Sequence, residues 1–126
     1  MKLERDLLKQ ISKRLSLYHM MGQIIWWSRL NSGHVKTYFG TYIKLCDKNT
    51  PDFIVLYYDK SHGLNALFIE AKSDTGRLSK GQKEFSDRYT QPNIMILTLR
   101  DIKELDMFLE QSAIDITEGM KEWNLK

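Results

Sequence analysis

The chain has 126 residues, 42% of them hydrophobic and 28% charged, which is the size and balance of one globular domain over residues 1–126. Its single cysteine, Cys46, excludes an internal disulfide framework, and no apolar run reaches the roughly 18–20 residues that a membrane span requires. The net charge of +3 is uneven, because residues 101–126 are acidic and the preceding part is basic, so one surface is suited to a polyanion.

The N-terminal third of the chain predicts one helix and two strands. Over residues 3–18, leucine and isoleucine recur at helical spacing, with lysine and arginine on the other face. Residues 23–30 predict a short aromatic strand. Residues 35–45 predict a longer strand, in which Gly40 marks a bulge.

The most informative pattern lies in residues 52–72. Two apolar runs there flank a turn-rich stretch centred near Ser61, which predicts an antiparallel hairpin with Asp52 opposite Glu70. Because side chains alternate along a strand, Lys72 shares the face of Glu70. Two opposed carboxylates repel each other unless a cation lies between them, and oxygen ligands suit Mg²⁺ or Mn²⁺. The hairpin therefore predicts a site for metal-assisted phosphodiester hydrolysis.

A second helix and a further strand follow the hairpin. Ser79 and Gln82 form a capping box, which predicts a helix that ends near Tyr89. Residues 93–99 are almost continuously apolar, as in a strand buried on both faces, and Met95 is expected in the core. The strand–helix–strand connection predicts a parallel pair beside the antiparallel hairpin, and hence an α/β fold with a mixed sheet.

A last helix is predicted after Asp101, which is a favourable N-cap residue. Residues 112–126 form either a further short helix or a frayed tail. The side of the last helix that is expected to be buried consists of Ile102, Leu105, Met107, Phe108 and Leu109.

The ordered motifs resemble the PD-(D/E)XK nuclease superfamily and, within it, the virus-type replication-repair nuclease (VRR-NUC) domains in a stand-alone, phage-like form. Pro51-Asp52 and Glu70-Ala71-Lys72 match the two halves of the family pattern. Residues 76–85 are similar to the stretch that follows it, and residues 27–33 to the segment after the first helix. The resemblance spans residues 4–99. It implies a restriction-endonuclease-like sheet flanked by helices, with an αβββαβ core and an added C-terminal helix.

The resemblance also implies an activity. The expected enzyme is a Mg²⁺- or Mn²⁺-dependent endodeoxyribonuclease that selects branched DNA, such as Holliday junctions or flaps. It would act as a homodimer in the cytoplasm of a bacterial or phage-infected host cell. The alternative is a DNA-binding or assembly module of the same fold without catalysis. A third possibility is a regulator that docks through its acidic C-terminal helix.

The resemblance assigns metal ligands and two polar partners. Asp52 and Glu70 would hold the metal together with the backbone carbonyl of Ala71. Lys72 would position the attacking water and offset charge on the phosphate. Gln82 would reach the water or the phosphate, or it would serve only in the capping box.

Further site residues are expected on other elements. Glu4 would make an outer-sphere or second-metal contact, or it is an ordinary surface glutamate. One departure from the family is that Lys48-Asn49-Thr50 stands where small, Gly-rich residues often precede Pro-Asp. Phosphate contacts are expected from Arg29, His34, Lys36, Arg77, Lys80 and Lys83, and candidate dimer contacts are Trp26, Tyr38, Phe39 and Tyr42.

Overall fold

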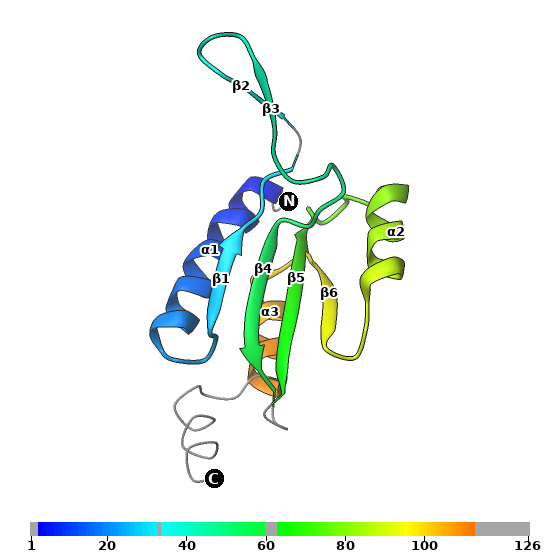
Figure 1. Ribbon diagram of the computed structural model, residues 1–126. Helices are drawn as coiled ribbons and strands as arrows, with labels where there is room; N and C mark the ends of the chain where they lie inside the picture. The colour runs from blue at the N-terminus through cyan, green and yellow to red at the C-terminus, as the bar shows by residue number, and fades with distance from the viewer. Residues whose placement is uncertain (1–2, 33, 60–62, 113–126) are drawn as a thin grey trace.

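The computed structural model describes residues 3–32, 34–59 and 63–112, which form one mixed α/β arrangement (Figure 1). Within these ranges no helix is both long and apolar enough to cross a bilayer. The prediction for residues 113–126 lies outside the described residues. The elements are α1 (Glu4–Met20), β1 (Trp26–Arg29), β2 (His34–Lys36), β3 (Tyr42–Lys44), β4 (Phe53–Tyr58), β5 (Leu64–Ala71), α2 (Lys80–Tyr89), β6 (Ile94–Leu99) and α3 (Ile102–Ser112).

Four strands form the main sheet in the order β1-β4-β5-β6. Strands β1, β4 and β5 are antiparallel, whereas β6 runs parallel to β5. Phe53 pairs with Ile69 and Tyr58 with Leu64, which confirms the register predicted for the hairpin. The parallel pairing of β6 confirms the crossover through α2. The sheet is therefore mixed, as the sequence predicts.

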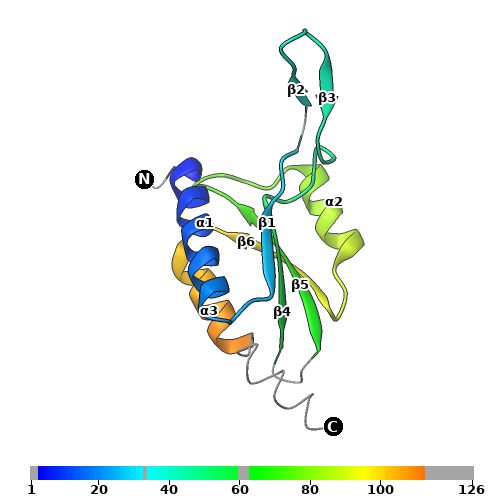
Figure 2. The ribbon, with the colours of Figure 1, turned by 60° about the vertical axis from the view of Figure 1, so that its left-hand side comes forward.

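Helices cover both faces of this sheet, with α1 and α3 on one side and α2 on the other (Figure 2). Alternate residues of β4 and β5 point to each side. Phe53, Val55 and Leu67 are fully buried in the core that contains the apolar residues of α1 and α3. On the opposite face Phe68 contacts Phe85 of α2, with ring centroids 5.9 Å apart. This alternation places Glu70 on the α2 side of β5.

The first and last helices are joined through one carboxylate. Leu7, Ile11 and Leu15 bury the inner stripe of α1, as the helical spacing predicts. The hydroxyl of Tyr18 donates a hydrogen bond to Asp106 Oδ1 at 2.7 Å, and Arg14 forms a salt bridge with the other carboxylate oxygen. Burial and the hydrogen bond to Asp106 raise the pKa of Tyr18, so its hydroxyl stays protonated as a donor.

The segment predicted as one strand over residues 35–45 is instead a second, separate hairpin. Strands β2 and β3 pair only with each other, and they project from the end of the sheet where β4 begins and β5 ends (Figure 1). Gly40 is not a bulge in a continuous strand. It has a φ of 82°, a left-handed conformation that glycine adopts without strain, and it closes the turn between the two strands.

Two methionines predicted to be buried are exposed. Met95 of β6 has a relative exposure of 46% and Met107 of α3 one of 59%. Strand β6 is an edge strand with a neighbour on one side only, so it is not buried on both faces as its composition suggests.

Asp101 caps α3 as predicted, because its Oδ1 accepts a hydrogen bond from the Lys103 N–H at 2.9 Å. Leu105 and Leu109 are the residues of α3 that are buried.

We expect Asp106→Ala to lower the free energy of unfolding by about 1–3 kcal/mol, because Tyr18 and Arg14 lose a shared acceptor in a part-buried position. Urea or thermal unfolding would measure the change. Glu84→Ala, which removes an exposed carboxylate from α2, is the control and should alter stability by less than about 0.5 kcal/mol. Equal effects of the two substitutions would contradict this role of Asp106.

Candidate active site

The candidate site lies at the end of the sheet where β5 finishes and β4 begins. Asp52 immediately precedes β4, Glu70 lies at the end of β5, and Lys72 follows that strand directly. Gln82 approaches from the first turn of α2. The antiparallel register of β4 and β5 brings the first two together from positions that are distant in the chain.

Asp52 is fixed by hydrogen bonds on both sides of Glu70. Its backbone N–H donates to the carbonyl of Ile69 at 2.9 Å, and its Oδ2 accepts from the N–H of Ala71 at 2.8 Å. The Arg29 guanidinium lies 3.8 Å from Oδ1 of Asp52. The Asp52 carboxylate is therefore held beside Glu70, with Oδ2 hydrogen-bonded to the backbone of β5 and Oδ1 near the Arg29 guanidinium.

Glu70 is a nearly buried carboxylate, with a relative exposure of 6%. Its Oε1 accepts a hydrogen bond from Nε2 of Gln82 at 2.8 Å, and the Lys72 ammonium lies 3.7 Å from the same oxygen. A buried charge of this kind requires polar partners, and both partners are residues that the sequence singled out.

Gln82 serves the capping box and the site at the same time. Its side-chain Oε1 accepts a hydrogen bond from the backbone N–H of Ser79 at 2.9 Å, and its backbone N–H donates to Ser79 Oγ at 3.1 Å. The side-chain nitrogen Nε2 is left to donate to Glu70. The two roles that the sequence left open are therefore compatible, because they use opposite ends of one amide.

The surroundings of Glu70 favour its protonated form. Burial raises its pKa to about 7, and the nearby negative charge of Asp52 contributes in the same direction. Lys72 opposes this rise, and Glu4 in the first turn of α1 adds to it. Glu4 is exposed, but it is close enough to affect Glu70 electrostatically, which places it at the rim of the site.

The donor set is compatible with a hydrated divalent ion. Within the described ranges, no three His, Cys, Asp or Glu side chains gather into a ready-made metal cluster. Mg²⁺ does not need such a cluster, since it keeps several waters and commonly uses one or two carboxylates. Asp52, Glu70 and the carbonyl of Ala71 are the residues that would hold it.

The cationic residues predicted to contact phosphates fall into three groups. Arg29 belongs to the site itself, since it lies near Asp52 and its guanidinium is 5.1 Å from the ring centroid of Phe53. The second group, His34 and Lys36, is on the projecting β2–β3 hairpin. The third group is exposed on the loop before α2 and on its first turn, and it consists of Arg77, Lys80 and Lys83.

One residue that organises the site was missed by sequence reasoning. Nη1 of Arg100 donates to the carbonyl of Ser73 at 2.7 Å and to that of Gly76 at 2.6 Å. These bonds fix the loop that leads from Lys72 towards α2. A single arginine after an apolar strand carries no pattern, so no signal in the sequence points to this role.

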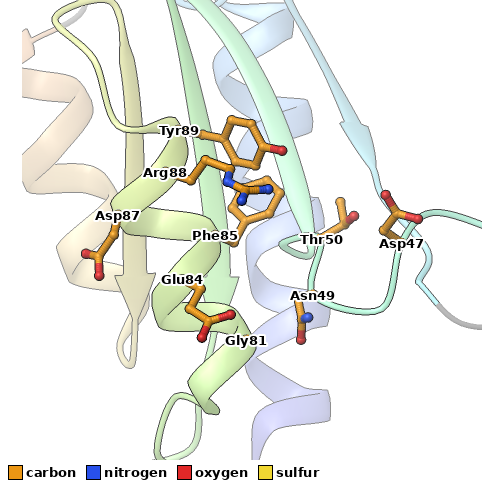
Figure 3. A pocket seen from close by; sticks show the side chains of 9 residues that line it. All are labelled: Asp47, Asn49, Thr50, Gly81, Glu84, Phe85, Asp87, Arg88 and Tyr89. Carbon is orange, nitrogen blue, oxygen red and sulfur yellow. The ribbon is translucent and has the colours of Figure 1, made fainter.

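A groove lies next to the site, between α2 and the loop that enters β4 (Figure 3). Its volume is about 570 Å³. Gly81 leaves room for the side chain of Asn49, because a Cβ at that position would lie 2.3 Å from Nδ2 of Asn49. The groove is lined by Asp47, Asn49, Thr50, Gly81, Glu84, Phe85, Asp87, Arg88 and Tyr89.

We expect Glu70→Gln to remove a pH dependence of stability, measured by unfolding in EDTA. The pKa of Glu70 is about 7 in the folded protein and 4.5 for an unperturbed glutamate, so the folded state binds this proton more tightly. The resulting stabilisation is complete below pH 4.5 and is lost as the pH rises to about 7. At pH 8 the variant should be more stable than the wild type, by on the order of 2 kcal/mol after allowance for solvent screening.

The matched control is Glu84→Gln, which changes an exposed carboxylate on α2 and should keep the wild-type pH profile. A Glu70→Gln protein that loses stability between pH 4.5 and 7 as the wild type does would contradict the electrostatic description of the site.

Comparison with known proteins adds no relative to this description. No protein-family model, no curated protein and no solved structure matches the chain. The candidate site is therefore defined by the geometry of its own residues.

Proposed function

We propose that the protein is a Mg²⁺- or Mn²⁺-dependent endodeoxyribonuclease that selects branched DNA. The observation that carries the proposal is the buried carboxylate of Glu70, which is grouped with Asp52, Lys72 and Gln82 at one end of the sheet. Hydrolysis of a phosphodiester needs a place for a cation, a positioned water and a positive charge near the phosphate. The cluster offers a residue for each requirement.

The carboxylate pair supports a metal at this place. Burial raises the pKa of Glu70 and the charge of Asp52 adds to the rise, and a divalent cation between the two carboxylates would relieve their repulsion. The carbonyl of Ala71 would complete the protein ligands. When bound, the ion would polarise the phosphate and lower the pKa of a coordinated water.

The remaining residues of the cluster have positioning roles. The ammonium of Lys72, 3.7 Å from Glu70, would orient the attacking water and offset negative charge on the phosphate. Gln82 fixes Glu70 through its hydrogen bond and thus sets the direction of the carboxylate. Glu4 would act on a second ion or on outer-sphere water from the rim.

The element order supports the same assignment. Without the projecting hairpin, the chain runs α1-β1-β4-β5-α2-β6, which is the αβββαβ order of a restriction-endonuclease-like core, and α3 is added after it. The exposed cations Arg77, on the loop before α2, and Lys80 and Lys83, on its first turn, would contact the DNA backbone.

The choice of branched DNA rests on the resemblance to VRR-NUC domains. A four-way junction is resolved by two symmetric cuts, so we propose that two copies of the chain act together. Trp26 is a candidate for the contact between them, because it is 48% exposed on β1, an edge strand of the sheet.

We expect the wild type to cut a synthetic four-way junction in Mg²⁺, and the substitutions Asp52→Ala, Glu70→Ala and Lys72→Ala each to reduce the rate by at least about 100-fold, as removal of charge stabilisation at a reacting centre does. Denaturing gels of a labelled junction would measure cleavage. All three variants should still bind the junction in EDTA or Ca²⁺.

Glu84→Gln is the control for cleavage, since Glu84 is an exposed residue of α2 outside the cluster, and this variant should cut at the wild-type rate. Full activity of Lys72→Ala would refute the positioning role of Lys72 and leave the nuclease proposal in place. A wild type that binds the junction in Mg²⁺ or Mn²⁺ but never cuts it would replace the nuclease proposal with the DNA-binding module of the same fold.

We expect Mn²⁺ or Mg²⁺ to raise the melting temperature of the wild type by mass action. At a metal concentration 100 times the Kd, the stabilisation is about 2.7 kcal/mol. Asp52→Asn removes one carboxylate charge and should abolish most of this gain in differential scanning fluorimetry. An Asp52→Asn protein with the full gain would place the metal elsewhere.

A further inference from the structure

The β2–β3 hairpin forms an arm, defined here as the described residues of 31–46. At its base the N–H of Cys46 donates to the carbonyl of Asn31 at 2.8 Å. At its end the N–H of Thr37 donates to the carbonyl of Thr41 at 2.7 Å, and Gly40 closes the turn. At about 3.3 Å per residue, the arm reaches roughly 20 Å beyond its base. Both ribbon views show it standing clear of the helices (Figures 1 and 2).

The arm has no packing partner in the described part of the chain. Every residue of β2 and β3 is exposed, and the two strands pair only with each other. An isolated two-stranded hairpin is marginally stable in water, so an exposed one of this length is suited to a ligand that it lies against.

One face of the arm is basic. The register pairs His34 with Lys44 and Lys36 with Tyr42, so these four side chains share a face, whereas Val35 and Ile43 share the other. The Lys36 ammonium lies 6.0 Å from the ring centroid of Tyr42. Lys44 forms a 2.8 Å salt bridge with the exposed Asp47 at the base of the arm.

The tip of the arm is aromatic. Tyr38 and Phe39 are 97% and 89% exposed, and their rings meet edge to face with centroids 5.4 Å apart. Small and polar residues are usual at the corner of a turn, because this position is fully hydrated. Two large rings there offer flat apolar surfaces to a ligand outside the protein.

Both ends of the arm are attached at the candidate active site. On one side Arg29 lies 3.8 Å from Asp52, and the N–H of Leu30 donates to the Asp52 carbonyl at 2.8 Å. On the other side the chain returns through Asn49 and Thr50 directly to Pro51 and Asp52. A ligand held along the arm is thus directed to the residues proposed to cut it.

We propose that the arm recognises the branch point of DNA: its basic face lies along a duplex groove while Tyr38 and Phe39 stack on bases exposed at the branch. This inference deepens the proposed function and rests on it. A two-stranded ribbon fits the major groove, and aromatic side chains stack without regard to sequence on the π-face of bases that the branch leaves uncovered. A second copy that bound through the same face would bring the same lysines together, so an isologous contact between two arms is a poorer occupant of this face than DNA.

The test measures equilibrium binding in EDTA, where no cleavage occurs, by fluorescence anisotropy of a four-way junction and of a linear duplex with equal arm length. Tyr38→Ser/Phe39→Ser should weaken junction binding about 10-fold or more and change duplex binding less than about twofold. Lys36→Gln/Lys44→Gln should weaken binding to both DNAs, and the slope of log K against log salt should become less steep by about 2.

Two controls match these variants in number and chemistry. Met20→Ser/Met107→Ser changes exposed apolar residues of α1 and α3, and Lys9→Gln/Lys13→Gln changes exposed lysines of α1. Neither control should reproduce the effect of its partner variant. Unchanged melting temperatures confirm that substitutions on the exposed arm leave the body folded.

Wild-type junction affinity in the tip variant overturns the inference, as does a wild type that binds neither DNA. A tip variant that changes from dimer to monomer in light scattering also overturns it, because the arm then contacts a second copy. The nuclease proposal is judged separately, by cleavage in Mg²⁺. A wild type that never cuts but shows the expected binding pattern removes the catalytic role and leaves branch recognition by the arm in place.

Discussion

The carboxylate of Glu70 is buried where a strand ends, and polar residues from three parts of the chain meet around it. Gln82 donates to it from α2, Lys72 lies beside it, and Asp52, just before β4, is hydrogen-bonded to Ile69 and Ala71 on either side of it. The same group has a pKa of about 7, so the cluster changes charge near neutral pH. Lys72 favours the charged form of Glu70, whereas burial and Asp52 favour the protonated form.

Gln82, in the first turn of α2, both caps the helix and donates a hydrogen bond to Glu70. Gln82 would be fixed by its capping box with Ser79 even without the site, since both hydrogen bonds of the box are made within four residues. The box orients the free amide nitrogen towards Glu70. Helix α2 buries none of its residues fully, so its place beside the sheet depends on a few contacts, such as that between Phe85 and Phe68.

The hairpin and the polar cluster were predictable because their signals are local. The apolar runs and the turn between them set the register, which in turn brings Asp52 to Glu70. The capping box was readable for the same reason. Met95 was misplaced because composition does not show that β6 is an edge strand. Arg100 was missed because its acceptors are 24 and 27 positions away and leave no trace in spacing.

The projecting β2–β3 hairpin shows a second limit of prediction from the sequence. Residues 35–45 have the composition of a strand, and Gly40 is compatible with either a bulge or a turn. The choice depends on φ at one residue and on whether the two halves pair with each other. The local pattern alone does not decide it.

The contact between α1 and α3 has a consequence for how the chain is made. Arg14 and Tyr18 reach a carboxylate 92 and 88 positions later in the sequence. Helix α1 is synthesised before the sheet, and its partner α3 is synthesised after it. Its apolar stripe therefore lacks α3 until all the strands of the main sheet have been made, and the core of the described residues is completed only when α3 follows them.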